Sequence, residues 1–191
     1  MTPAHEVSMP GPAAELAARL RAGVPLVDTP RLRLRAPVLE DFPVYAGIAC
    51  GPRGAGIGGP MTREDAFDDF AKMVAGWLLR GHGLWTIEPR AGGAPLGFVL
   101  IGFEPGDREP ELGFMLTEAA EGRGIAAEAA AAARDHGFGA LGLPSMASYI
   151  ARDNARSRAL AERLDARLEM PADWDDPDTL VYRHPRPEVR Q

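Results

Sequence analysis

A short glycine turn between a predicted strand and an alanine-rich helix is the feature that most constrains the fold of this chain. Residues 121–128 read Glu-Gly-Arg-Gly-Ile-Ala-Ala-Glu, preceded by the apolar run Glu111–Leu116 and followed by the alanines of residues 129–133. Two glycines allow successive backbone N–H groups to converge on one point, and the helix N-terminus adds about half a positive charge there. The segment therefore predicts an anion site, for which a pyrophosphate group is the natural ligand.

Two better-known phosphate motifs do not fit this turn. The dinucleotide fingerprint Gly-x-Gly-x-x-Gly would need a third glycine at the position of Ala127. A Walker loop would continue with Gly-Lys-Ser or Gly-Lys-Thr, and neither follows here. Because Gly-x-Gly before a helix is also common without any ligand, the rest of the chain has to decide its meaning.

The composition is that of one globular domain. The 191 residues are 46% hydrophobic and 25% charged, enough for a substantial core. A net charge of −6 argues against a nucleic-acid or anionic-membrane surface and weakly suits a cationic substrate. No signal peptide and no apolar run long enough to span a bilayer is found, so we expect a cytoplasmic protein.

Cysteine and histidine usage predicts no metal site. A single cysteine, Cys50, excludes an internal disulfide and a zinc cluster, and we expect it to be a small buried or loop residue rather than a nucleophile. The four histidines are scattered without the spacing of metal ligands. Of these, His184 could line a cleft after the last predicted strand, but we favour a surface position.

Hydrophobic periodicity predicts a sheet protein with interspersed helices. We expect an N-terminal extension over residues 1–28, partly disordered or in a short helix, a main domain over 29–186 and a tail over 187–191. Glycines crowd the segment Gly51–Pro60, which predicts a mobile loop. The predicted strands are Arg31–Arg35, Leu84–Glu88, Pro95–Phe103, Glu111–Leu116, Ser145–Ile150 and Thr179–Arg183, and the predicted helices are Leu39–Ala49, Thr62–Arg80, 123–138 and Asn154–Leu164.

This element order and the motifs within it resemble the GNAT superfamily of acyl-CoA-dependent N-acyltransferases, in its ribosomal-protein alanine N-acetyltransferase branch. The resemblance extends from Thr29 to Pro185. Two positions depart from the family pattern: Glu121 stands where Gln or Arg opens the motif Gln/Arg-x-x-Gly-x-Gly/Ala, and Asp165 stands where glycine is frequent. The residues that carry the resemblance are Thr29-Pro30-Arg31-Leu32, Glu111-Leu112-Gly113, Gly122 through Ala129, and Asn154-Ala155-Arg156-Ser157.

The resemblance implies an α+β fold: a mixed, mostly antiparallel sheet of six to seven strands, flanked by helices, with one splayed pair of parallel strands. It also implies that acetyl-CoA is the co-substrate and that no metal takes part. The pantetheine arm would lie in the gap between the splayed strands, and the turn amides would hold the pyrophosphate. The cofactor-binding residues implied are Phe114, Met115, Leu116, Glu121, Gly122, Arg123, Gly124, Ile125, Ala126, Asn154 and Ser157.

Several of these residues have a second interpretation. In the strand, the free backbone groups are expected around Met115 and Leu116. Arg123 either contacts phosphate or is a solvated turn residue. Asn154 is also a good helix N-cap, while in the resemblance its side chain reaches the pantetheine or the acyl end. Ser157, one turn later, would face the same cleft.

The proposed chemistry needs a base and a proton donor. An amine attacks a thioester only as the free base, and Glu111, at the start of the strand beside the gap, is the candidate general base. The alternative is that Glu111 only binds the substrate ammonium. The leaving thiolate would be protonated by Tyr149 or Ser148 on the partner strand, or by Ser157, and a backbone N–H near Met115 would stabilise the oxyanion.

The sequence thus predicts an acetyl-CoA-dependent N-acetyltransferase that moves an acetyl group directly to a primary amine in a ternary complex. The acceptor is a protein N-terminus or a small molecule, with no nucleic-acid or membrane partner. The oligomeric state stays open, a homodimer included. A non-catalytic acyl-CoA sensor and an unrelated α/β nucleotide-binding module are the alternatives.

Overall fold

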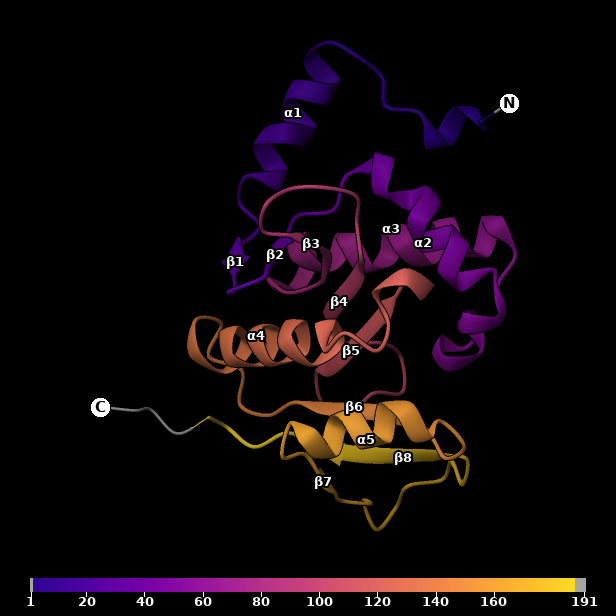
Figure 1. The fold of residues 1–191 in the computed structure, drawn as a ribbon, viewed down its shortest axis with the longest axis vertical. Coiled ribbons are helices and arrows are strands. Elements are labelled where there is room, and N and C mark those ends of the chain that lie inside the picture. Colours follow the sequence, from indigo (N-terminus) through magenta and orange to yellow (C-terminus); the bar gives the residue numbers. More distant parts are fainter. Residues whose placement is uncertain (1, 188–191) are drawn as a thin grey trace.

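The computed structural model describes residues 2–187 and shows one mixed sheet with helices on both faces (Figure 1). Four 3-10 turns, at Ala4–Glu6, Leu39–Asp41, Pro52–Ile57 and Glu118–Ala120, join the larger elements. The helices are α1 (Pro12–Arg21), α2 (Phe42–Ala49), α3 (Arg63–Arg80), α4 (Ile125–Gly139) and α5 (Ala155–Arg163). The strands are β1 (Val27–Asp28), β2 (Leu32–Arg35), β3 (Leu84–Pro89), β4 (Gly97–Gly102), β5 (Glu111–Leu116), β6 (Ala147–Ala151), β7 (Arg167–Leu168) and β8 (Thr179–Arg183).

The eight strands lie in the order β1-β2-β3-β4-β5-β6-β8-β7, and every neighbouring pair is antiparallel except β5–β6. This confirms the mixed, mostly antiparallel sheet with one parallel pair. The two strands beyond the expected six are β1 and β7, each two residues long at or near a sheet edge. Such short strands carry no readable period-two pattern, so their pairing is visible only in three dimensions.

Each face of the sheet has its own apolar core. On one face, Leu112 of β5 packs with the alanines of α4, and α5 contacts the same face through β6. On the other face, Met115 of β5 packs with Phe42 of α2 and Phe70 of α3. Strand alternation sends Glu111, Gly113 and Met115 to the α2–α3 face, and that face therefore receives the candidate base.

Local signals in the sequence placed most boundaries well. Strands β5 and β8 have the predicted limits, and Thr62 caps α3 by accepting the N–H of Asp65 at 3.1 Å. The glycine-rich segment, which we expected to be a mobile loop, contains a 3-10 helix over residues 52–57. Gly54 within it is buried, and a Cβ there would come within 2.0 Å of the Ala49 carbonyl oxygen, so glycine is required.

The N-terminal extension contacts the main sheet at several points. Helix α1 corresponds to the short helix expected there, and β1 pairs with β2. The carboxylate of Glu6 is fully buried and accepts two hydrogen bonds of 2.7 Å from Arg63 at the start of α3. Trp85 donates its indole N–H to the Pro25 carbonyl at 2.8 Å. All but the first residue of the predicted tail, residues 187–191, lies outside the described residues.

Within residues 2–187, no helix has both the length and the apolar character needed to cross a bilayer.

Candidate functional site

The parallel strands β5 and β6 separate soon after they meet. Among the described residues they form a single bridge, between Glu111 and Ala147, where the Ala147 N–H donates to the Pro110 carbonyl at 3.0 Å. Beyond that bridge the strands form a fork with backbone groups on both inner edges. This fork is the splayed parallel pair that the sequence led us to expect.

The free backbone groups of β5 in the fork belong to Phe114 and Leu116. The Leu112 carbonyl points toward β6, whereas the Thr117 N–H donates to Leu96 on the β4 side. Because backbone groups alternate between the two edges of a strand, those of Phe114 and Leu116 face the fork. By the same alternation the backbone groups of Met115 face β4. Of the two residues around which we expected free groups, Leu116 therefore faces the fork and Met115 does not, and Phe114 joins Leu116.

The glycine turn lies at the N-terminus of α4, which packs against β5. Gly122 and Gly124 have φ values of 69° and 75°, in the left-handed region that glycine adopts readily. The first main-chain bond of α4 runs from the Glu128 N–H to the Gly124 carbonyl, so the N–H groups of residues 122–127 have no main-chain acceptor among the described residues. Ile125 is buried and anchors the helix start, and the partly buried Ala126 packs against the same core. This is a backbone cradle for an anion.

A polar cluster connects the glycine turn with the segment before β2. Arg31 donates to the Glu128 carboxylate at 2.6 Å and to the Arg123 carbonyl at 3.0 Å, and Thr29 donates its hydroxyl to Glu128 at 2.6 Å. From the sequence, Thr29 and Arg31 belong only to the segments that resemble the family, and no role is predicted for them. Arg31 and Glu128 have opposite charges and can form an ion pair. Because they lie far apart in the sequence, no local pattern predicts that they are in contact.

A clamp of ion pairs connects the turn to two other segments. Glu121 contacts Arg53 of the glycine-rich segment at 3.1 Å and Arg156 of α5 at 2.7 Å. These arginines lower the pKa of Glu121 through hydrogen bonds and charge, with Arg156 contributing most. The side chain of Arg123 lies on the exposed surface and donates to the Ala119 carbonyl at 3.3 Å. Glu121, which departs from the family pattern, is therefore the centre of a charged network.

The N-terminus of α5 closes the mouth of the fork. The Asn154 side-chain oxygen caps the helix by accepting the Ser157 N–H at 3.1 Å. The amide nitrogen of Asn154 faces the glycine-rich segment, since a Cβ on Gly56 would lie 3.2 Å from it. The capping interpretation of Asn154 therefore holds for its oxygen and leaves the amide nitrogen for other contacts. Ser157 is half-buried.

Glu111 lies at the closed end of the fork, half-buried at the start of β5. Burial raises its pKa to about 8, and the nearby carboxylates of Asp107 and Glu104 add to the increase. The backbone N–H of Tyr149 interacts with the Glu111 carboxylate and partly opposes this shift. A carboxyl group that titrates near neutral pH can accept a proton there, as a general base must.

The hydroxyl of Tyr149 is held by the loop before β5. It accepts the backbone N–H groups of Arg108 and Glu109 at 3.0 and 3.3 Å, and its ring stacks on Trp174. Burial raises the pKa of Tyr149. These contacts give Tyr149 a structural function, which is the alternative to its catalytic interpretation.

The expectation of a surface position for His184 is wrong. His184 is 4% exposed and its Nε2 lies 2.9 Å from the hydroxyl of Ser148, which donates at 2.6 Å to the Leu112 carbonyl. Ser148 is therefore engaged on the α4–α5 side of the sheet. Cys50 is exposed, in the loop after α2.

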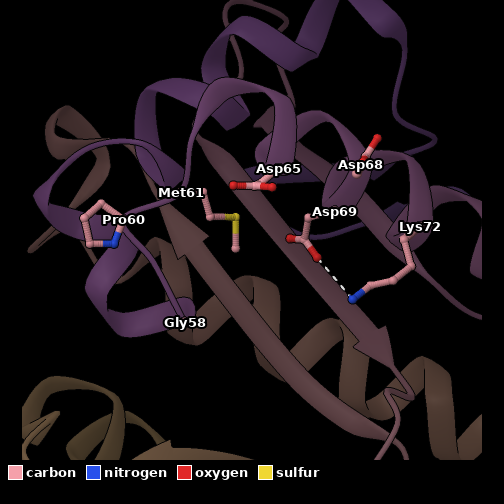
Figure 2. Close-up of a pocket in the computed structure, with 7 residues that line it drawn as sticks. All are labelled: Gly58, Pro60, Met61, Asp65, Asp68, Asp69 and Lys72. Carbon is pink, nitrogen blue, oxygen red and sulfur yellow. Dashed lines mark ion pairs between the residues drawn. The ribbon is translucent and has the colours of Figure 1, made fainter.

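A groove of about 440 Å³ lies on the α2–α3 face, between the glycine-rich segment and the first turns of α3. Figure 2 shows Asp65 and Asp69 extending toward Met61, with Lys72 paired to Asp69 at 3.3 Å. Lys72 also contacts Glu104 at 2.7 Å, one of the carboxylates that act on Glu111. The groove and the candidate base are thus linked through one chain of charged contacts. The groove is lined by Gly58, Pro60, Met61, Asp65, Asp68, Asp69 and Lys72.

In the part of the chain that the structure describes, no group of three or more histidine, cysteine, aspartate or glutamate side chains is arranged to hold a metal ion.

Comparison with known proteins agrees with this geometry. The family model for the acetyltransferase (GNAT) domain matches residues 31–167. An acetyltransferase from Agrobacterium tumefaciens is 40% identical, with a TM-score of 0.81, over 85% of this chain and 95% of that chain. A GNAT-family acetyltransferase from Bordetella pertussis is 26% identical, with a TM-score of 0.69, over 84% of this chain and 99% of that chain.

Ribosomal-protein N-acetyltransferases are among the structural neighbours. RimL, a ribosomal L7/L12 alpha-N-protein acetyltransferase, is 18% identical with a TM-score of 0.67, over 85% of this chain and 98% of that chain. That RimL structure is a complex with coenzyme A. At this identity the likeness concerns the fold.

Proposed function

The chain belongs to the GNAT acetyltransferase family, and we propose that it transfers the acetyl group of acetyl-CoA directly to a primary amine. The observation that carries this proposal is the meeting of three features at one fork: free strand backbone, an anion cradle and a carboxyl group of raised pKa. Family membership excludes an unrelated nucleotide-binding module, which leaves the non-catalytic sensor as the competing function.

The fork and turn suit acetyl-CoA in shape and in hydrogen-bonding groups. Phe114 and Leu116 offer N–H and carbonyl groups along an open strand edge, which an amide-containing arm can pair with as an added strand. The turn amides from Gly122 to Ala126 offer donors to a pyrophosphate. We propose that Asn154 contributes its amide nitrogen at the mouth of the fork. Coenzyme A supplies the activated thioester when it is bound.

Glu111 is proposed as the general base. The amine reaches Glu111 as an ammonium ion, which the surrounding acidic side chains attract, and Glu111 accepts its proton directly or through water. The neutral amine then attacks the thioester carbonyl, and the carbon–sulfur bond breaks. We propose a free N–H of β5, from Phe114 or Leu116, as the oxyanion donor, because Met115 is paired with β4.

We propose Ser157 as a proton relay: its hydroxyl gives a proton to the leaving thiolate and takes up the proton that the nitrogen loses as the amide forms, so the hydroxyl is regenerated. The hydroxyls of Tyr149 and Ser148 have backbone partners in the loop before β5 and at Leu112, respectively. Ser157 is half-buried beside Asn154, at the mouth of the fork. Direct transfer is proposed over a covalent acyl-enzyme because Cys50, the one cysteine, lies exposed after α2.

The acidic groove on the α2–α3 face is the proposed entrance for the acceptor. It lies on the same face of the sheet as Glu111 and is linked to it through Lys72 and Glu104. An acceptor that carries positive charge near the reacting amine suits this surface.

Release of free thiol from acetyl-CoA, measured over a panel of amines, tests the proposed function. The panel should include peptides with different N-terminal residues, polyamines and free amino acids. We expect thiol release and an acetylated product with at least one class, and a rate that rises with pH toward 8 because Glu111 must be deprotonated. Tight binding of acetyl-CoA without thiol release from any amine would instead identify a sensor.

A further inference from the structure

The β5–β6 pairing ends where a side chain contacts the strand. In a continuing parallel ladder, the N–H of Tyr149 would donate to the Leu112 carbonyl, because the preceding bond runs from Ala147 to Pro110. The hydroxyl of Ser148 donates to that carbonyl at 2.6 Å. The single β5–β6 bridge lies just before this contact, and the fork begins after it.

The orientation of the Ser148 hydroxyl is set by His184. The Leu112 carbonyl can only accept, so the hydroxyl proton of Ser148 points to it. The 2.9 Å contact between Ser148 and His184 Nε2 must then be donated by the histidine, which defines its tautomer. Both side chains are 4% exposed, and the N–H of His184 donates to the Met146 carbonyl at 2.9 Å.

His184 stays neutral in this position. Burial lowers its pKa to about 4, the charge of Arg134 on α4 adds to this decrease, and Glu109 opposes it. Its Nδ1 is buried and has no hydrogen-bond partner among the described residues. A neutral imidazole with Nε2–H is therefore a constant donor to Ser148 across the pH range in which the proposed base titrates.

Tyr149, the residue after Ser148, connects this pair with Glu111. The N–H of Tyr149 forms a hydrogen bond with the Glu111 carboxylate. The other charged groups around that carboxylate are Asp107 and Glu104 in the loop before β5, and Lys72 of α3 pairs with Glu104 at 2.7 Å. The Tyr149 N–H is thus a hydrogen-bond donor to the Glu111 carboxylate, which the neighbouring carboxylates otherwise repel.

We propose that Ser148 and His184 are positioning residues for acetyl transfer: together they end the strand pairing at Leu112 and thereby leave the Tyr149 N–H free to orient Glu111. The kinetic test of this inference rests on the proposed function, because it measures acetyl transfer. A buried serine–histidine pair that only stabilises the core is the competing explanation.

The pH dependence of kcat/KM separates the two explanations. In Ser148→Ala, the Leu112 carbonyl recaptures the Tyr149 N–H, and we expect the midpoint of the Glu111 limb to rise by about one unit. Below that midpoint the rate should fall roughly ten-fold, because one unit changes the deprotonated fraction by that factor. Ser148→Thr keeps the hydroxyl and should restore the midpoint, and His184→Gln, which keeps a donor, should shift it less than His184→Phe.

An NMR titration tests the inference without any acceptor and therefore independently of the proposed function. In the unaltered protein, the backbone amide of Tyr149 should follow a titration with a midpoint near 8, and Glu111→Gln should abolish it. Ser148→Ala should weaken that response and Ser148→Thr should keep it. If Ser148→Ala does not fold, the comparison of Ser148→Thr with His184→Phe takes its place. A Tyr149 amide that ignores Glu111, or variants that lose stability with an unmoved midpoint, would overturn the inference.

Discussion

The proposed cofactor side and the proposed acceptor side of this protein are built from different parts of the polypeptide. The fork and the turn present main-chain groups of Phe114, Leu116 and residues 122–127, and they depend on strand pairing and on two left-handed glycines. The groove on the α2–α3 face presents side chains from one helix and one loop, among them three aspartates.

The difference teaches where each function can change. Main-chain groups look the same for most side chains, so the cofactor side keeps its binding ability unless the backbone or the local charge is altered. Side chains of the groove can be exchanged while α3 remains a helix, so the acceptor can change without a change in fold. The same contrast orders the following predictions, from the largest effect to the smallest.

Gly124→Asp should weaken acetyl-CoA binding by about a hundred-fold or more, since a carboxylate at the pyrophosphate adds repulsion to the strain of a left-handed φ. A Cβ at this position would lie 3.4 Å from Arg31, which could pair with the new carboxylate, so Gly122→Asp serves as a second variant. Gly142→Asp is the matched control, because Gly142 has a φ of 65° and open space but lies after α4. Calorimetry that finds equal affinity in all three would remove the turn from the site.

Glu111→Gln should lower kcat by roughly ten- to a thousand-fold near neutral pH while acetyl-CoA affinity hardly changes. Because the folded pKa is about 8, the unaltered enzyme should gain activity as pH rises through 8, and the variant should lack that limb. Glu104→Gln removes one repulsive charge and should move the limb to lower pH with activity retained. A raised acceptor KM with normal kcat would instead show that Glu111 only binds the ammonium.

Glu121→Gln should tighten acetyl-CoA binding by about two- to five-fold at low salt, because a negative charge near the pyrophosphate is removed and two arginines are released. The same change loosens the link between the turn and Arg53, so the acceptor KM should rise slightly. Arg53→Ala is the control, because it removes the Glu121–Arg53 ion pair without releasing an arginine side chain near the pyrophosphate. Weaker binding of acetyl-CoA in Glu121→Gln would mean that the clamp shapes the turn itself.

Truncation before Thr29 should leave acetyl-CoA affinity within about three-fold, because the deleted residues contact the sheet edge and α3 rather than the fork. Thermal stability should fall more after truncation before Thr29 than after truncation before Val24. Only the protein that starts at Val24 keeps β1 and the Pro25 carbonyl that accepts the Trp85 indole N–H. We propose the domain start near Val24 on this basis. A large loss of affinity in a folded truncated protein would place the extension in the cofactor site.

The sequence predicted the strand, the turn and the helix start around the proposed cofactor site because their determinants are local. Glycines before a helix, an apolar strand of fixed length and an N-cap at Asn154 each act within a few residues. The parallel pair was implied by the resemblance to the GNAT superfamily. The sequence could not show that Met115 turns toward β4, because a one-residue register decides which backbone groups are free.

The missed features depend on contacts between distant segments. Arg31 with Glu128, and Ser148 with His184, join residues far apart in the chain, and no local pattern marks such pairs. The glycines of residues 51–60 predict a mobile loop because glycine has no helical preference, and the 3-10 helix within it depends on the packing of Gly54 against Ala49. Tertiary contact decided each of these positions.

The central claim, that main-chain groups of one region hold acetyl-CoA, can be tested directly by titrating the nitrogen-15-labelled protein with acetyl-CoA and following its backbone amides. We predict large, saturable shifts for Phe114, Leu116, Gly122 and Gly124, and small ones for the amides around Asp69 in α3. Shifts concentrated in α3, with the turn and the fork unaffected, would contradict the account.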